Sequence, residues 1–282
     1  TLDAFNPHLP PEPNKLAETI RDLEQRGLLQ YDGHERRYDL HPVVRGVAAG
    51  GMKAEDKERY GQSVVDHFSA QPHSPYEQAK SLEDLSSGLH VVRTLLKLGH
   101  FQQAADAYIG DLSTALLINL EAYADILSLL RPFFPAGWGT LPENVRPRIA
   151  GYLTNEAAIA LRHCGEPLES LAAYGAAIRA DWEAERWNLV CIGLNNISIL
   201  LVARNLLAKA HRIDSLALDL ATTLDDAENL FRSRLFIFYH QSRIGQWQAA
   251  ETAWRQLDPM GRNWSRAIYR QGLAEEYFAH AR

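Results

Sequence analysis

Few reactive side chains in this sequence of 282 residues stand in a spacing that could support catalysis. The eleven histidines lack the spacing of metal ligands, and neither a His-Glu-x-x-His nor a Cys-x-x-Cys motif occurs. There is no Gly-x-x-x-x-Gly-Lys-Ser/Thr loop to hold a triphosphate, and no motif like a nucleophile elbow. We therefore expect no enzymatic activity, no metal and no cofactor in this chain itself.

One histidine, His41, stands where an imidazole could contact a phosphate. It precedes Pro42, a residue that favours the first position of a helix. A helix N-terminus favours an anion, and an imidazole can donate a hydrogen bond to a phosphate oxygen. The alternative is a histidine that bonds only to its own neighbours at the start of a helix, and both interpretations stay open on these grounds.

The elements around His41 are a helix, a hairpin and a second helix. Residues 14–25 predict the first helix, residues 28–31 and 37–40 the two strands, and residues 42–49 the second helix. This order is typical of the second half of a winged-helix domain. We therefore expect a partial winged helix at residues 1–50.

The residues of this segment resemble the winged helix that ends the NTPase module of STAND proteins, the signal-transduction ATPases related to apoptotic and plant-resistance switches. The matching residues are Leu23-x-x-x-Gly27-Leu28-Leu29 and Tyr38-Asp39-Leu40-His41-Pro42-Val43-Val44-Arg45. In that family the position of His41 lies in a Met-His-Asp type motif, here Leu-His-Pro. The resemblance implies that His41 reaches the β-phosphate of ADP in a longer parent protein. It also implies an NTPase core in the same parent chain, which binds ADP or ATP.

The second half of the chain carries one pattern three times. The copies are Gly165-Glu-Pro-Leu-Glu-Ser170, Asn205-Leu-Leu-Ala-Lys-Ala210 and Gly245-Gln-Trp-Gln-Ala-Ala250, and their first residues are 40 positions apart. Gly and Asn tolerate the left-handed conformation that ends a helix. The small residue five positions later allows a second helix to pack closely on the first. A fixed period of this size, with one helix pair per period, predicts an α-solenoid.

The pattern resembles a tetratricopeptide-repeat array, in which a Gly closes helix A and a small residue opens helix B. Gly99 to Tyr108 supplies a fourth copy further upstream, while Pro167, Ser170, Asn205 and Asp214 depart from the family pattern. We expect a mainly α fold, a tetratricopeptide-like right-handed superhelix over residues 51–282. Trp264 to Ala281 would form its last helix or a cap.

The resemblance also implies which residues line the concave groove, because helix A faces it at its second, fifth, ninth and twelfth positions. In this sequence the three units place Tyr152, Asn155, Ile159 and Arg162, then Ile192, Asn195, Ile199 and Val202, then Arg232, Leu235, Tyr239 and Ser242 there. The candidates for contact with a ligand or partner are the polar or aromatic members Asn155, Arg162, Asn195, Arg232 and Tyr239. The alternative for each of them is a solvated face without a ligand.

The composition of the chain limits the classes of partner that it can bind. A net charge of −6, with six basic and eight acidic side chains in residues 1–50, argues against binding to nucleic acid or an anionic membrane. No apolar run is long enough for a membrane span, so no spanning helix is expected. Cys164 and Cys191 fall at opposite ends of helices A, and we expect reduced thiols in a cytoplasmic protein. Because the chain starts at Thr1 without a signal-like segment, we expect it to be part of a longer protein.

Together these observations predict a non-catalytic sensor or protein-interaction module of a STAND-type ATPase. A protein, peptide or small-molecule effector would bind the concave face, and the partial winged helix would relay this to the NTPase core. The alternatives are a constitutive scaffold that binds a peptide or partner helix, and the sensor of a transcriptional activator.

Overall fold

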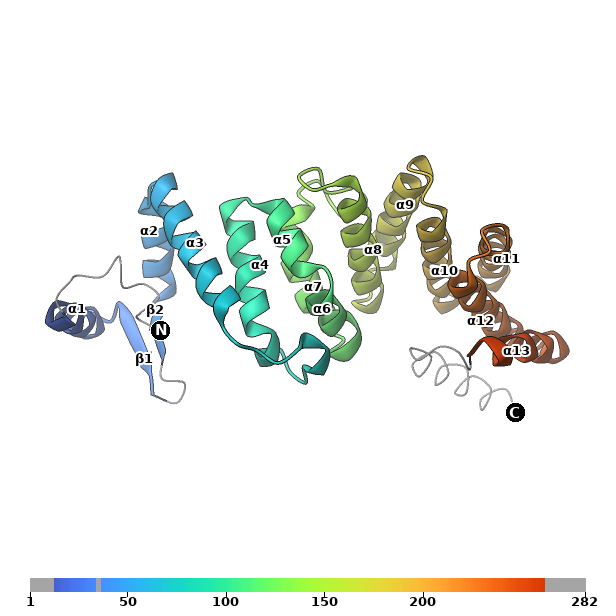
Figure 1. Ribbon diagram of the computed structural model, residues 1–282, viewed down its shortest axis with the longest axis horizontal. Helices are drawn as coiled ribbons and strands as arrows, with labels where there is room; N and C mark the ends of the chain where they lie inside the picture. The colour runs from blue at the N-terminus through green and yellow to red at the C-terminus, as the bar shows by residue number, and fades with distance from the viewer. Residues whose placement is uncertain (1–12, 34–36, 262–282) are drawn as a thin grey trace. The chain divides into compact units, whose positions relative to one another are not determined.

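The computed structural model describes residues 13–33 and 37–261, so the last helix expected at Trp264 to Ala281 lies outside them. The helices follow one another in chain order, and the two strands form one hairpin (Figure 1). The elements are α1 (Pro13–Gln25), β1 (Leu29–Asp32), β2 (Arg37–Leu40), α2 (Pro42–Gly51), α3 (Ala54–Ala70), α4 (Ser86–Leu98), α5 (Phe101–Tyr108), α6 (Asp111–Thr114), α7 (Tyr123–Leu130), α8 (Pro147–His163), α9 (Pro167–Glu183), α10 (Trp187–Ala203), α11 (Leu207–Thr223), α12 (Ala227–Arg243) and α13 (Trp247–Gly261). The expected mainly helical fold with a hairpin near its start is confirmed for the described residues.

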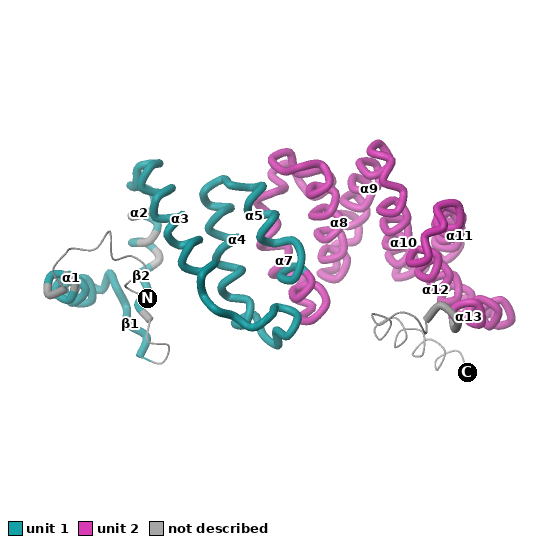
Figure 2. Tube along the Cα trace, in the orientation of Figure 1, with its two compact units in different colours: residues 1–113 teal, residues 114–282 magenta. Residues whose placement is uncertain are grey.

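The chain divides into two compact units, residues 1–113 and 114–282 (Figure 2). In the first unit α3 packs on α4 and α4 on α5, and in the second unit each helix from α7 to α13 packs on the next. The domain boundary predicted after residue 50 lies inside the first unit and stays a prediction. None of the described helices combines the length and apolar composition that crossing a membrane requires.

The described part of residues 13–51 forms the expected helix, hairpin and helix. Gly27, with φ +66°, ends α1, and the hairpin pairs Leu29 with Leu40 and Tyr31 with Tyr38. The rings of Tyr31 and Tyr38 are 4.9 Å apart, yet both side chains remain about half exposed. Among residues 13–78, none of the side chains that the structure describes is buried. The described side chains of this segment therefore form no buried hydrophobic cluster.

The second unit contains the repeats, and its helices begin at an interval that is half the period of the sequence pattern. Six consecutive helices, α8 to α13, begin at positions 147, 167, 187, 207, 227 and 247, and each helix from α8 to α12 is 17 residues long. Between them stands one left-handed residue per connection, with φ between +52° and +84°: Gly165, Glu185, Asn205, Asp225 and Gly245. Each period of the sequence pattern therefore contains two equal steps, one for each helix of a pair.

Each of these five helix ends closes in the same way. The N–H of the residue after the left-handed one donates to the carbonyl five positions earlier, as from Glu166 to Leu161 at 2.9 Å and from Arg186 to Asp181 at 2.8 Å. The N–H of the left-handed residue donates to the carbonyl three positions earlier, as from Gly165 to Arg162 at 3.3 Å. This is the Schellman arrangement, which satisfies the last carbonyls of a helix. It allows the chain to reverse through a very short connection.

Glu185 is expected to be a strained member of this series. A side chain with a Cβ is disfavoured at positive φ, whereas glycine is not. We expect Glu185→Gly to raise the free energy of unfolding by about 0.5–1 kcal/mol, and Gly245→Ala to lower it by about 1 kcal/mol. Urea-induced unfolding followed by circular dichroism measures both changes. A loss of stability in Glu185→Gly would show that the Glu185 side chain has a stabilising role that outweighs the strain.

The helices alternate between two layers. The first, the A layer, is α8, α10 and α12, and α10 contacts both of the others. The second, the B layer, is α9, α11 and α13. Small residues allow close crossings between the layers: Ser170, Ala210 and Ala250 are all buried, and the Ser170 hydroxyl donates to the carbonyl of Ala158 at 2.8 Å. The departure of Ser170 from the repeat pattern is therefore accommodated by a hydrogen bond across the crossing.

Candidate functional site

Over its central turns, from Ala150 to Arg162, helix α8 has one accessible face. Between Ala150 and Arg162 only Tyr152, Asn155, Ile159 and Arg162 are not buried. Their spacing of three, four and three positions keeps them on one side of a helix. These are the four positions that the repeat resemblance placed on the groove, so in this helix the accessible stripe and the expected one coincide.

The accessible residues of helix α10 lie at slightly different positions of the repeat. Its half-buried residues include Ile192, Asn196 and Ile199, whereas Asn195 has no exposed surface and Val202 is buried. Asn195 was expected on the open side, but the described structure places its neighbour Asn196 there. The physical reason is helix phase, because one residue corresponds to about 100° of rotation and a fixed frame of positions ignores such a shift. Whether Asn195 contacts a ligand stays a prediction.

Helix α12 follows the phase of α10. Arg232, Phe236 and Tyr239 are half-buried, and Leu235 and Ser242 are buried. We name the open stripe of the three A-layer helices the A face, and it consists of Tyr152, Asn155, Ile159, Arg162, Ile192, Asn196, Ile199, Arg232, Phe236 and Tyr239. Four of the five predicted contact residues belong to it, and Asn195 does not.

Side-chain amides connect the A-layer helices. On the A face the Asn196 amide donates to Asn155 Oδ1 at 3.1 Å, which links α10 to α8. Beneath the face Asn195 and the Ser233 hydroxyl exchange hydrogen bonds at 3.3 Å, which link α10 to α12. A buried amide without partners would be costly, so these contacts explain why a helix as apolar as α10 carries two adjacent asparagines.

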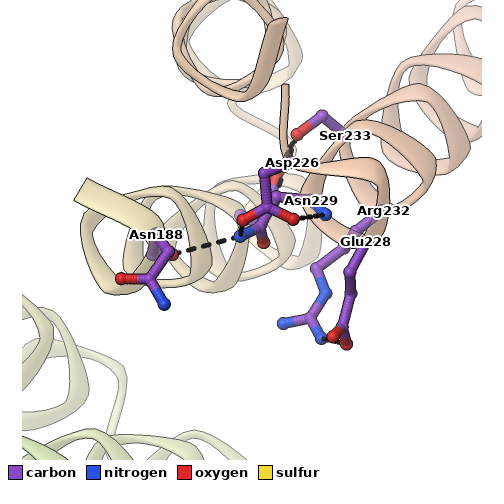
Figure 3. A network of polar contacts seen from close by, with 7 residues as sticks. Asn188, Asp226, Glu228, Asn229, Arg232 and Ser233 are labelled. Atoms are coloured by element: carbon purple, nitrogen blue, oxygen red, sulfur yellow. Dashed lines mark hydrogen bonds and ion pairs between the residues drawn. The ribbon is translucent and has the colours of Figure 1, made fainter. Parts of the chain in front are cut away.

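A second set of contacts joins the beginnings of α10 and α12 (Figure 3). Asp226 caps α12 by accepting from the Asn229 N–H at 3.0 Å, and the Asn229 amide donates to Asp226 at 2.7 Å and to the Asn188 carbonyl at 3.2 Å. Arg232 pairs with Glu228 at 3.1 Å one turn away on the same helix. The guanidinium of Arg232 on the A face therefore already has an acidic neighbour.

The C-terminal end of α8 carries the other cationic residue of the A face. Arg162 Nη2 lies 2.9 Å from His163 Nε2, and the His163 ring stacks on Tyr123 of α7 at 4.0 Å. Partial desolvation, and then the charge of Arg162, lower the pKa of His163, while Glu121 opposes this shift. Burial raises the pKa of Tyr174 to about 12, and the Arg162 charge partly offsets the effect. Both side chains are therefore neutral beside Arg162 near pH 7.

The lowered pKa of His163 predicts a pH dependence of stability. Below about pH 6.5, the ordinary value of histidine, the unfolded chain takes up a proton that the folded chain resists, so stability falls as the pH drops through this range. His163→Phe keeps a ring to stack on Tyr123 but cannot titrate, and we expect it to reduce this loss between about pH 6.5 and 5. Unfolding midpoints measured across this range in both proteins test the prediction. An equal loss in both would assign the dependence to other groups.

His41, the expected phosphate contact, is an exposed residue at the start of α2. Its Nδ1 accepts from the Val43 N–H at 3.3 Å, so the imidazole caps the helix and its proton lies on Nε2. Pro42 takes the first helical position, as predicted. This geometry gives His41 a local structural role and leaves Nε2–H available as a donor.

The interior of the second unit also contains a pair that the sequence did not reveal. Asp214 of α11 and His240 of α12 contact one another through Oδ2 and Nδ1, and both side chains are almost completely inaccessible to solvent. Asp214 stands at the repeat position that holds Tyr174 in the preceding unit. A polar residue at an expected packing position was the available signal, but nothing in the sequence named its partner in the next helix.

No cluster of three or more histidine, cysteine or acidic side chains that could hold a metal occurs in the part of the chain that the structure describes. No family model, curated protein or solved structure matches the chain. The candidate site is therefore the A face, an open surface of amide, aromatic and aliphatic side chains with two cationic ones.

Proposed function

We propose that this chain is the sensor part of a STAND-type signal-transduction ATPase, a non-catalytic module that binds an effector on the A face. In this proposal the helix pairs form a right-handed, tetratricopeptide-like superhelix with the A face on its concave side. Binding would be relayed through the partial winged helix to an NTPase core in a longer parent chain. The ligand must favour the active state over the inactive one for such a relay to operate.

The observation that carries the proposal is the accessible stripe on α8. Between Ala150 and Arg162 every other residue of this helix is buried, so Tyr152, Asn155, Ile159 and Arg162 are accessible as a set. Conformational entropy is lost when side chains are ordered on an open surface. A stripe that continues over three helices, with amides linked between helices, is more readily explained by recognition than by stability.

The first 50 residues support the relay. A helix, a hairpin and a second helix with no buried side chain among those described cannot hold themselves together by hydrophobic burial. They need further elements to pack against, as the second half of a winged-helix domain would. This is the reason to favour a switch protein in which His41 faces a nucleotide.

The constitutive scaffold is the second candidate, and the cap made by His41 favours it. Nδ1 of His41 accepts a hydrogen bond from the Val43 N–H, which gives the residue a structural role without any nucleotide. A scaffold would use the A face in the same way but would have no ADP-bound state. The two candidates therefore differ in what His41 does and agree on the binding surface.

Substitution of His41 in the full-length parent separates them. One hydrogen bond to a charged phosphate contributes about 1.5–3 kcal/mol, so His41→Ala should speed ADP release by roughly tenfold to a hundredfold. His41→Asp is the matched control, because aspartate is a strong N-cap but repels a phosphate. If His41 holds ADP, both variants release it faster while the stability of the aspartate variant is unchanged.

Nucleotide release and thermal unfolding, measured on the same preparations, give the two readouts. Unchanged ADP release in His41→Asp, together with lower stability in His41→Ala, would assign His41 to capping alone. The scaffold would then be the better proposal.

A further inference from the structure

Successive helix pairs of the second unit meet in two chemically different ways. Where α9 meets α10, Tyr174 and Leu200 are buried in one apolar cluster, and the backbone of Gly193 lies against Ile178. At the equivalent place one repeat later, between α11 and α12, the two side chains are Asp214 and His240. The apolar contact of one junction is thus replaced by a buried polar pair in the next.

The polar junction is poorly satisfied. Asp214 Oδ1 and His240 Nε2 are buried and have no hydrogen-bond partner among the described residues. Two neighbours share this property, His211 Nδ1 one turn before Asp214 and Gln241 Oε1 beside His240. Buried polar atoms without partners favour any state in which water reaches them. Separation of α11 from α12 would hydrate Asp214 Oδ1 and His240 Nε2, because these two side chains meet across the junction.

The opposite side of the same junction is well connected. In the A layer Asn195 of α10 bonds to Ser233 of α12, and Asn229 of α12 bonds to the Asn188 carbonyl of α10. These contacts hold α10 and α12 together at two levels along their length. Leu230 of α12 still packs on the apolar cluster that contains Ala217 and Ala221 of α11, so the poorly satisfied part of this junction is the Asp214–His240 pair. The hydrogen-bonded α10–α12 side can therefore serve as the axis of a rotation.

We infer that the α11–α12 junction is a hinge, at which the last described helix pair, α12 and α13, opens away from α11 while the rest of the second unit stays folded. Opening would turn Arg232, Phe236 and Tyr239 relative to Ile192 and Asn196. It would therefore change the angle between the α10 and α12 parts of the A face. The hinge itself does not depend on the proposed function. The coupling of the hinge to ligand binding does rest on it, because a ligand that contacts both parts of the A face would favour the closed junction.

Cys191 is a natural reporter of this opening. Its thiol is fully buried, donates to the Ala217 carbonyl of α11 at 3.2 Å and lies 3.9 Å from the Ser233 hydroxyl of α12. Burial raises its pKa, so it is a poor nucleophile while the junction is closed. The other cysteine, Cys164, is exposed, and Cys164→Ser leaves Cys191 as the single thiol of the chain.

The experiment measures the rate at which Cys191 of the Cys164→Ser chain reacts with a disulfide reagent such as DTNB in increasing urea below the unfolding transition. A hinge predicts that Cys191 reacts at least tenfold faster than global unfolding permits, with a weaker dependence on urea, because less surface is exposed than in unfolding. Replacement of the pair by Asp214→Val with His240→Leu should slow the reaction tenfold or more at low urea.

Two results would overturn the hinge. One is a reaction of Cys191 at the rate and urea dependence of global unfolding, and this test needs no substitution at the junction. The other is an unchanged reaction rate in the double variant when it is folded. Neither result depends on a ligand, so failure of the hinge is distinguishable from failure of the proposed sensor function.

Discussion

Replacement of His240 alone by leucine is expected to lower the free energy of unfolding by about 3–5 kcal/mol. The substitution leaves the Asp214 carboxylate buried beside an apolar side chain, without the imidazole that it contacts in the native protein. A buried polar group that loses its partner is among the larger single-residue penalties in protein stability. Asp214→Val should be costly for the corresponding reason, because it leaves the His240 ring buried without its acceptor.

The double variant, Asp214→Val with His240→Leu, is expected to be neutral or more stable than the native protein by about 1–4 kcal/mol. It removes both desolvated groups together and puts an apolar contact at the place where Tyr174 and Leu200 make one in the preceding unit. Urea unfolding of the native chain, both single variants and the double variant forms a double-mutant cycle that isolates the coupling. Additive losses in the double variant would mean that Asp214 and His240 contribute independently and that their contact is not a pair in the energetic sense.

Gly193→Ala is expected to lower the free energy of unfolding by about 1–3 kcal/mol, although alanine is the better helix former. A Cβ at Gly193 would lie 2.5 Å from Ile178 Cγ1 and 3.0 Å from its Cδ1, across the packing of α10 on α9. Cγ1 is close to the backbone of α9, so relief requires the two helices to move apart. The glycine is therefore needed for close approach of the two layers.

Gly175→Ala is the matched control for this prediction, and its effect should have the opposite sign. Gly175 lies inside α9, and the nearest atom to an added Cβ is Arg179 Nη1 at 3.6 Å, an ordinary contact. Helix propensity alone should then raise stability by about 0.5–1 kcal/mol. Thermal and urea unfolding of both variants measure the difference. Equal gains in the two variants would mean that Ile178 moves away from Gly193 without cost.

The repeating helix pairs could be predicted from the sequence because their cause is local. Gly165, Asn205 and Gly245 mark helix ends through a left-handed backbone conformation that few other residues tolerate. The hairpin before His41 and the helix that starts at Pro42 have local causes as well, a turn region between alternating strands and a proline with no N–H to satisfy. Local signals of this kind can be recognised in the sequence because they do not depend on which element packs against them.

The equal step from each helix to the next was not visible in the sequence, because the left-handed positions 185 and 225 hold Glu185 and Asp225 and not the glycine or asparagine that marks the other three helix ends. Their left-handed conformation was therefore seen only in the folded structure. The phase of α10 is also a tertiary property. Asn195 and Asn196 are adjacent and chemically identical, and the packing of α10 between α8 and α12 decides which of them is buried against Ser233 and which reaches Asn155.

The sequence by itself thus determined the helix pairs and the lack of a catalytic or phosphate-binding motif, because each depends on residue types at short or regular spacing. Its groove residues came from the repeat resemblance, and their contact with a ligand stays a prediction. Tertiary structure alone brought Asp214 to His240, since their contact requires α11 and α12 to fold against one another. The tertiary structure likewise placed Gly193 where α10 packs closely on Ile178 of α9. It also left the segment before residue 79 without a buried side chain among those described. Burial is a property of the whole fold, and it decides whether a polar residue is a surface contact, a paired group in the core or an unsatisfied one.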